Sequence, residues 1–482
     1  MQLTKKMKSI SGAFAALVLA ATSFVAATGA QAAEGNPDLT KTGSITVHKY
    51  ANPAWANAKN DGTEQTAPAT ATALDGVQFS VQKLTDFDLS DATSWSNLEK
   101  LTYSNGKAMA GTKEYTLGTA TTMQTANGGV AKFENLAAGV YLVTEGEDLG
   151  NNNIISKAAP FFVSVPLPNE TSWLYDVHAY PKNSVSNDGE KVPGDTANTR
   201  KVGDDQPWTI TYPVPALGEG ETYTKLGIED NLSQYLKYSS VSATLAGVAL
   251  EQDVDYTVTV TNETKGDTDT TLRQLVTVQL TAAGLAKVKA GDELKLMLNT
   301  KITGFPTNGE IDQAFGPIVN DYQPGSDTTK TDKPVTMGDF WIQKQDKDNQ
   351  KALEGAEFTV YESEDDAKAG TNPVTTLISD AQGKAVSVGL DLDYKDSKKF
   401  YIKETKAPAG YVLNNEVKEI TVKKGQSTQL DITIDNTKQT GPNLPLTGST
   451  GQILMTLAGI AVLASAVGLS FVYMRRNRRD NV

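Results

Sequence analysis

The sequence of 482 residues contains no cysteine and only two histidines. Without cysteine the chain has no disulfide framework, no thiolate zinc site and no thiol nucleophile. His48 and His178 both lie in strand-like runs, where a solvated or partnered histidine is expected instead of a metal ligand or a general base. The sequence therefore predicts no metal site and no cofactor, and it argues against hydrolase triads and metal catalysis.

Positive charge is also in deficit: the chain has 44 Lys and Arg residues against 57 Asp and Glu residues, so its formal net charge is −13 at pH 7. Both ends of the chain are basic and both look removable, so the mature protein is expected to be more acidic still. A strongly acidic surface repels phosphate backbones. Nucleic acid is therefore excluded as a partner.

Helix-forming patterns do not dominate the chain. Short runs rich in Val, Ile, Thr, Tyr and Phe alternate with turns of Gly, Asn, Asp and Pro, a pattern typical of β-sandwich domains. A single hydrophobic core stops growing well below this chain length. We therefore expect an all-β protein with three tandem immunoglobulin-like β-sandwich domains.

The amino terminus has the order of features found in a secretory signal. Residues 1–32 carry lysines, then an apolar stretch from about Ile10 to Val25, and then the small-residue triplet Ala30-Gln31-Ala32. A membrane-anchoring helix is the alternative, but the apolar run is short and ends at an Ala-x-Ala site. We expect cleavage, so that the mature chain starts at Ala33.

The carboxyl terminus combines three features in a fixed order. Ile453 to Met474 is an uncharged apolar run, long enough as a helix to cross a hydrocarbon core of about 30 Å. Four arginines between positions 475 and 479 follow it, and by the positive-inside rule they stay in the cytoplasm. Just before the span stands the pentapeptide Leu444-Pro445-Leu446-Thr447-Gly448, which resembles the LPxTG sorting signal of Gram-positive surface proteins.

This resemblance implies a chemistry for the pentapeptide. A sortase cysteine attacks the carbonyl of Thr447, releases the chain from Gly448 onward and holds the protein as a thioester. Pro445 fixes an extended approach, and Gly448 lets the enzyme backbone come close. Wall peptide or a lysine of another copy then accepts the acyl group. The alternative is a chance pentapeptide beside an ordinary single-span anchor.

The chain also repeats one plan twice. Each copy has a first strand with a lysine, a Leu-acidic-Gly turn before a second strand, an aromatic-x-aliphatic-x-Glu strand, and a closing strand that ends in asparagine. The matching residues are Lys49 and Lys344, Gly76 and Gly355, Glu145 and Glu404, and Asn183 and Asn436.

In the second copy, Phe400 to Tyr411 reads FYIKETKAPAGY and resembles the E-box of Cna-B-type pilin domains. The resemblance implies an isopeptide bond between Lys344 and Asn436, with Glu404 as the catalyst. A lysine enclosed in an apolar core loses its charge and becomes nucleophilic, while a protonated Glu404 polarises the amide and moves protons as ammonia leaves. The alternative is a surface lysine in a simple salt bridge with Glu404.

The first copy lacks the Ala-Pro-x-Gly-Tyr continuation after Glu145. Whether Lys49 forms an equivalent bond with Asn183 therefore stays open at this point.

The stretch between the two copies resembles a pilin middle domain of the Cna-A-like kind. Lys191 precedes its first strand, Asp230 follows in Ile228-Glu229-Asp230-Asn231-Leu232, and Asn320 ends it. The resemblance implies a bond from Lys191 to Asn320 with Asp230 as proton shuttle. A turn or helix cap at Asp230 is the alternative.

Trp173 to Asn183 reads WLYDVHAYPKN and resembles the pilin motif of sortase-polymerised backbone subunits. Strand alternation puts Trp173, Tyr175, Val177 and Ala179 on one face, which we expect to be buried. Pro181 is expected to end sheet pairing and to hold Lys182 out at the domain boundary. The role implied for Lys182 is to attack the thioester at Thr447 of the next subunit; an isolated lysine is otherwise a solvated charge.

Together these resemblances cover nearly the whole chain and imply a structural backbone subunit of a cell-surface pilus that supports adhesion and is not an enzyme. The expected domains are 33–183, 184–330 and 331–440, between a signal peptide at 1–32 and a sorting signal at 441–482. The expected partners are a pilus-specific and a housekeeping sortase, other copies of the chain, peptidoglycan, minor tip and basal pilins, and an unidentified host receptor. The alternatives are a minor pilus subunit, a monomeric wall-anchored adhesin, and a secreted enzyme anchored at the surface.

Overall fold

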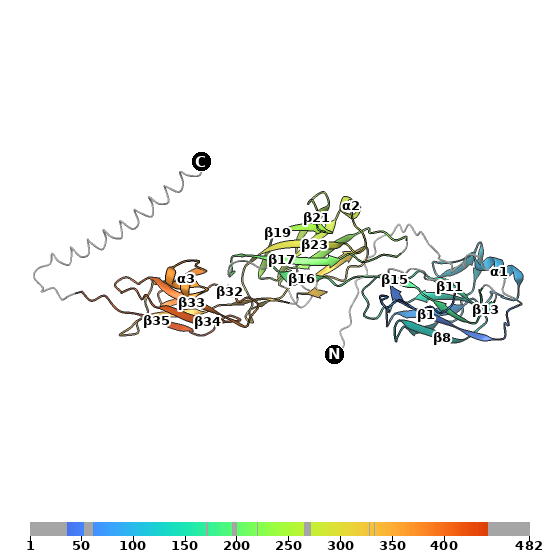
Figure 1. The fold of residues 1–482 in the computed structure, drawn as a ribbon, viewed down its shortest axis with the longest axis horizontal. Helices are drawn as coiled ribbons and strands as arrows, with labels where there is room; N and C mark the ends of the chain where they lie inside the picture. The colour runs from blue at the N-terminus through green and yellow to red at the C-terminus, as the bar shows by residue number, and fades with distance from the viewer. Residues whose placement is uncertain are drawn as a thin grey trace, which may run out of the picture.

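The computed structural model describes residues 36–441, except 53–60, 170–171, 195–199, 219, 265–270, 327 and 332. The expected signal peptide and the sorting signal with its apolar span lie outside these described residues. Within the part of the chain that is described, no helix is long and apolar enough to cross a membrane. The sheets fall into three groups that follow one another along the length of the molecule (Figure 1). We call them the N-terminal, middle and C-terminal modules.

The N-terminal module is a β-sandwich with an added small sheet. Its elements are β1 (Thr42–His48), β2 (Tyr50–Ala51), β3 (Gln78–Lys83), α1 (Ala92–Leu98), β4 (Leu101–Ser104), β5 (Lys107–Ala110), β6 (Lys113–Tyr115), β7 (Thr121–Gln124), β8 (Val130–Ala137), β9 (Gly139–Glu145), β10 (Ile154–Ser156), β11 (Phe161–Val165), β12 (Leu167–Asn169), β13 (Ser172–Leu174), β14 (Asp176–Ala179) and β15 (Lys182–Val185). The sheet β14-β1-β8 and the sheet β11-β9-β3-β7 share one core, because alternate residues of each strand point inward. Val47 of β1 and Phe79 of β3 belong to that core.

The middle module packs two five-stranded sheets, with orders β16-β17-β23-β19-β20 and β21-β22-β18-β25-β26. Its elements are β16 (Glu190–Pro193), β17 (Asp205–Pro213), β18 (Leu226–Asn231), β19 (Leu236–Leu245), β20 (Val248–Ala249), β21 (Tyr256–Thr264), β22 (Leu272–Leu280), α2 (Ala282–Leu285), β23 (Glu293–Ile302), β25 (Ala314–Val319) and β26 (Thr329–Lys330). The predicted alternation is confirmed in β17, where Trp208, Ile210 and Tyr212 are buried and the residues between them are partly exposed.

The C-terminal module contains the sheets β31-β28-β35 and β30-β29-β33-β34, joined by the small sheet β24-β27-β32. Its elements are β24 (Glu310–Ile311), β27 (Val335–Gly338), β28 (Trp341–Asp346), β29 (Glu357–Tyr361), α3 (Glu364–Ala369), β30 (Thr375–Ile378), β31 (Lys384–Val386), β32 (Leu390–Asp391), β33 (Ser397–Lys406), β34 (Val417–Lys423) and β35 (Ile432–Asn436). The first long strand, β28, pairs in parallel with the last, β35. Strand β24 lies in the sequence between β23 and β25 of the middle module but pairs with β27, so the two modules share a sheet.

A buried ion pair also joins the middle and C-terminal modules. The Arg200 guanidinium lies 2.8 Å from a carboxylate oxygen of Asp391, and both side chains are almost fully buried. The backbone N–H of Val202 donates to the carbonyl of Gly389 at 2.9 Å beside it. The all-β prediction with tandem sandwiches is confirmed by this architecture.

Candidate functional site

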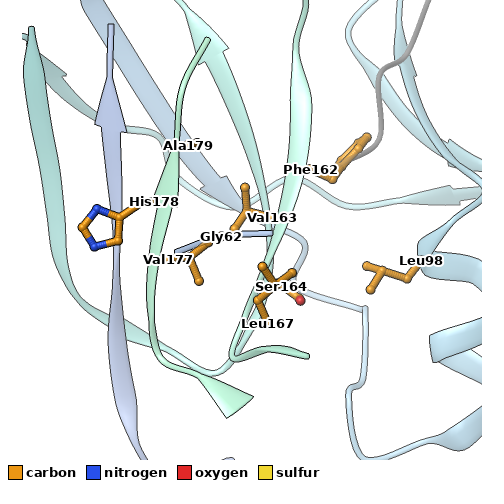
Figure 2. Close-up of a pocket in the computed structure, with 9 residues that line it drawn as sticks. All are labelled: Gly62, Leu98, Phe162, Val163, Ser164, Leu167, Val177, His178 and Ala179. Atoms are coloured by element: carbon orange, nitrogen blue, oxygen red, sulfur yellow. The ribbon is translucent and has the colours of Figure 1, made fainter. Parts of the chain in front are cut away.

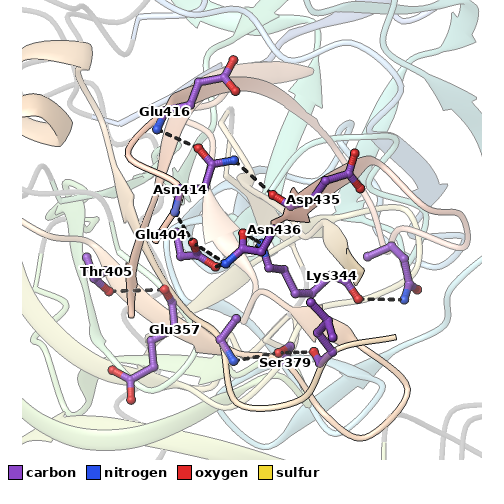
Figure 3. A network of polar contacts seen from close by, with 12 residues as sticks. Lys344, Glu357, Ser379, Glu404, Thr405, Asn414, Glu416, Asp435 and Asn436 are labelled. Atoms are coloured by element: carbon purple, nitrogen blue, oxygen red, sulfur yellow. Dashed lines mark hydrogen bonds and ion pairs between the residues drawn. The ribbon is translucent and has the colours of Figure 1, made fainter. Parts of the chain in front are cut away.

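The C-terminal module brings Lys344, Glu404 and Asn436 together in its core, from β28, β33 and β35 (Figure 3). Their exposed fractions are 0%, 2% and 2%. Lys344 Nζ donates to Asn436 Oδ1 and lies 3.0 Å from Glu404 Oε1. Asn436 Nδ2 lies 3.0 Å from each oxygen of Glu404, so the acid contacts both the amine and the amide nitrogen.

The surroundings of Lys344 favour its neutral amine. Its Nζ lies 5.6 Å from the ring centroid of Phe358, and burial lowers the pKa of the lysine despite the opposing effect of Glu404. Glu404 is in turn fixed by the backbone N–H of Asn414, at 2.6 Å. A lysine amine with a lowered pKa against a carboxamide, with a carboxyl group touching both, is the arrangement that amide exchange requires.

The N-terminal module repeats this triad with Lys49, Glu145 and Asn183. Lys49 Nζ donates to Asn183 Oδ1 and lies 3.0 Å from Glu145 Oε2, and Asn183 Nδ2 donates to Glu145 Oε1 at 2.6 Å. Burial lowers the pKa of Lys49 to about 8. The Phe79 ring, 5.6 Å from Lys49 Nζ, occupies the place that Phe358 has in the other module. The geometry is present although the longer E-box sequence is absent.

The middle module gives its buried lysine a different amide partner. Lys191 Nζ lies 2.5 Å from Asp230 Oδ2 and 2.9 Å from Gln313 Oε1. All three residues are at most 3% exposed, and the Trp208 ring centroid lies 5.0 Å from the amine. Desolvation by burial lowers the pKa of Lys191, against the attraction of Asp230.

This geometry corrects the expected partner Asn320. Its Oδ1 accepts the backbone N–H groups of Thr224 and Lys225 at 2.7 and 3.2 Å, and its Nδ2 donates to the carbonyl of Thr222 at 3.1 Å. The side-chain amide of Asn320 therefore makes its hydrogen bonds to the backbone of residues 222–225 and not to Lys191. The sequence pattern did not indicate Gln313, because the resemblance implied an asparagine at the end of a strand, whereas Gln313 directly precedes β25.

Lys182 also differs from its expected setting. Strand β14 ends at Ala179 and Pro181 belongs to no strand, but pairing resumes directly afterwards, since Lys182 begins β15 and pairs with Tyr50 of β2. The side chain is half-buried: Nζ donates to the carbonyl of Tyr180 at 3.2 Å and lies 5.1 Å from the ring centroid of Tyr50. Burial, with a smaller contribution from the charge of Lys49, lowers the pKa of Lys182 to about 8.

The expected buried face of the motif is only partly realised. Val177 and Ala179 are buried in β14, but Trp173 and Tyr175 are half-exposed, because β13 ends at Leu174 and β14 begins at Asp176. Thr447 and the rest of the pentapeptide 444–448 lie outside the described residues.

Three family profiles match the chain in the order of its modules. They are the Gram-positive pilin subunit D1, N-terminal domain, at residues 40–184, the prealbumin-like fold domain at 338–438, and the LPXTG cell wall anchor motif at 436–481. Fold and anchor together define a cell-wall-anchored surface protein.

Similar proteins cover nearly the full length. The major pilin SpaD of Corynebacterium diphtheriae is 30% identical, with a TM-score of 0.66, over 84% of this chain and 99% of that one. Fimbrial subunit type 2 of Actinomyces naeslundii is 29% identical over 93% of this chain and 92% of its own length. Fimbrial subunit type 1 of Actinomyces viscosus is 28% identical over 97% of each.

The chain belongs to the Gram-positive major pilins, the sortase-polymerised fimbrial subunits that an LPXTG motif anchors to the cell wall. Pilins are structural proteins and not enzymes. The prediction of a backbone subunit, made from the order of the motifs, is confirmed.

Proposed function

We propose that Lys182 of one subunit accepts the acyl group that a sortase forms at Thr447 of the next. The Thr447–Gly448 amide breaks as the sortase thiolate forms a thioester, and the amine of Lys182 then displaces the thiolate and forms the isopeptide bond. The observation that carries this proposal is the position of Lys182 in the pilin motif, half-buried between Tyr50 and Tyr180 with a lowered pKa. A pilus-specific sortase, a housekeeping sortase, wall peptidoglycan and minor tip or basal pilins are the partners we propose for assembly.

A pH dependence follows from this lowered pKa. Only the neutral amine attacks, and the titratable groups around it are Tyr50, Tyr180, Lys49 and His48. The transfer rate to Lys182 should therefore rise as the pH increases and level off above about 8, whereas an ordinary lysine with a pKa of 10.5 keeps gaining. The measurement is sortase-catalysed transfer of an LPLTG peptide, followed by mass spectrometry.

Because the sortase itself titrates, the control is a short lysine peptide used as acceptor under the same conditions. The ratio of the two rates cancels the enzyme's own pH profile. Between pH 8 and 10.5 the ratio of the Lys182 rate to the peptide rate should fall, because only the peptide amine still gains neutral form; a ratio that stays constant over this range would contradict the lowered pKa of Lys182. The Lys182→Arg variant decides separately whether Lys182 is the acceptor.

We further propose three intramolecular isopeptide bonds: Lys49 to Asn183, Lys191 to Gln313, and Lys344 to Asn436, with Glu145, Asp230 and Glu404 as the respective proton carriers. In each, the lysine amine forms a bond to the amide carbon, the carboxyl group transfers the proton, and ammonia leaves. In the two outer sites the carboxyl group contacts both the lysine and the asparagine, and in the middle site Asp230 and Gln313 both contact the buried Lys191, which supports this assignment. By analogy with disulfides, each cross-link stabilises its module by about 4 to 5 kcal/mol.

The middle module offers a direct test of its revised partner. In the Gln313→Ala variant the chain should still weigh less than its sequence, but the deficit should be smaller than the wild-type deficit by one ammonia, because the amide carbon is gone. The matched Asn320→Ala variant should keep the wild-type deficit, since that side chain only holds the loop at Thr224. Intact-mass measurement distinguishes the two, and the reverse result would restore Asn320 as the partner.

The domain limits 33–183, 184–330 and 331–440 are also part of this proposal. The grouping of the sheets supports these limits, although β15 of the N-terminal module continues to Val185 and β24 joins a sheet with β27. Each proposed cross-link then lies within one domain.

A further inference from the structure

The two histidines of the chain lie side by side, 130 positions apart in sequence. Strands β1 and β14 pair in parallel, which brings His48 Nε2 within 2.9 Å of His178 Nδ1. The His48 ring also stacks on Tyr180, with ring centroids 4.6 Å apart and planes 9° from parallel. Packing on both sides therefore holds the two imidazoles in place.

A third donor comes from the segment 61–65, which runs along the outer edge of β14. The backbone N–H of His178 donates to the carbonyl of Gly62 at 2.9 Å, and the N–H of Gln65 donates to the Tyr180 hydroxyl at 2.6 Å. These bonds bring the Glu64 carboxylate to the histidines: one ligand atom from each of the three residues lies within 4.8 Å of the others.

The close approach of this segment depends on Gly62. Its φ is +80°, and a Cβ there would lie 2.3 Å from Leu167 Cδ2. Figure 2 shows the His178 ring on the opposite side of β14 from the Val177 side chain, although His178 itself borders the small cavity that Val163 and Ser164 also line. The histidine therefore points away from the core, toward the side where Glu64 lies.

We infer that His48, Glu64 and His178 form a binding site for one divalent transition-metal ion of the zinc class. Two imidazole nitrogens and one carboxylate oxygen are a donor set that zinc prefers, and a fourth position stays open for water. Ligand atoms of a tetrahedral zinc ion lie about 3.3 Å apart, so the two imidazole nitrogens must separate by a few tenths of an ångström and the rings must turn until both lone pairs point at the ion. Without metal, the same nitrogens share a proton in a hydrogen bond.

The ion would fasten segment 61–65 to β14, the strand that leads to Lys182. In the sequence the two histidines gave no sign of this, because each stands alone in its own strand. The expectation that neither is a metal ligand rested on their positions in strand-like runs, where a solvated or partnered histidine is usual; the parallel pairing of β1 and β14 instead brings the two together.

The test is a zinc titration of the mature chain, kept with its anchor in mild detergent and carrying no histidine tag. We expect one Zn²⁺ per chain and a rise in the unfolding temperature of the N-terminal module with zinc concentration. His178→Gln and Glu64→Gln should each weaken binding on the order of 10- to 100-fold. Exposed Glu99→Gln is the matched control and should bind as the wild type does.

Selective labelling of histidine gives an independent readout, since only His48 and His178 contribute signals. Both imidazoles should shift together at one equivalent of zinc. Several weak sites that persist in His178→Gln, or the absence of any shift, would overturn the inference. Glu64 lies on an exposed segment, so Glu64→Gln keeps the test decisive if His178→Gln folds poorly. Because the metal is bound without a sortase, failure here leaves the proposed role of Lys182 untouched.

Discussion

A chain in which Lys182 is replaced by arginine is expected to be secreted and folded, yet to give no high-mass ladder in denaturing gels. Arginine keeps the positive charge beside Tyr50, but its guanidinium stays protonated and is no acyl acceptor. Loss of the nucleophile removes the covalent link between subunits, so wall extracts should contain single subunits only. An immunoblot of wall extracts with and without the substitution measures this.

The matched control is Lys132→Arg, an exposed lysine on β8 of the same module. It should leave the ladder at wild-type intensity. Digested wild-type fibres should contain a branched peptide that joins Thr447 to Lys182. A ladder that persists in the Lys182→Arg strain, or a branch at another lysine, would refute the assignment.

The mature wild-type chain is expected to weigh less than its sequence by three ammonia molecules, one for each buried lysine. Glu404→Ala and Glu145→Ala should each restore one of them, because the carboxyl group that moves the proton is missing. Each loss of a cross-link should lower the melting temperature of its own module by on the order of 20 °C. Intact-mass spectrometry and calorimetry on the same samples give both readings.

Exposed Glu416→Ala is the control, since the backbone of Glu416 contacts Asn414 but its side chain is not part of the Lys344–Glu404–Asn436 site. It should keep the full mass deficit and the wild-type melting temperature. A wild-type chain without any deficit would remove the intramolecular bonds from the proposal. A deficit that survives in Glu404→Ala would instead exclude Glu404 as the proton carrier.

The outer triads could be predicted because both copies show the same strands in the same order. Lys344 and Glu404 each stand on a strand whose alternation fixes the inward face, and β35 ends on Asn436 as expected. The N-terminal site stayed open in the sequence because the residues after Glu145 differ. The structure shows that strand positions alone bring Lys49, Glu145 and Asn183 together.

Features that depend on pairing between distant strands could not be predicted. Gln313 reaches Lys191 because β25 pairs with β18, which places it near Asp230. Lys182 is less exposed than Pro181 suggested, because Tyr50 of β2 lies across from it. Neither the pairing of β25 with β18 nor that of β15 with β2 can be inferred from the spacing of residues in the sequence.

The proposed cross-links also determine how a fibre responds when it is pulled. In a chain of subunits joined from Thr447 to Lys182, the tensile force enters each subunit at Lys182 and leaves it near the carboxyl end. The bonds from Lys191 to Gln313 and from Lys344 to Asn436 carry the tensile force past residues 192–312 and 345–435, so these residues cannot be unfolded and extended by pulling. Residues before Lys182 lie outside this route, so of the N-terminal module only β15, which begins at Lys182, bears tensile force.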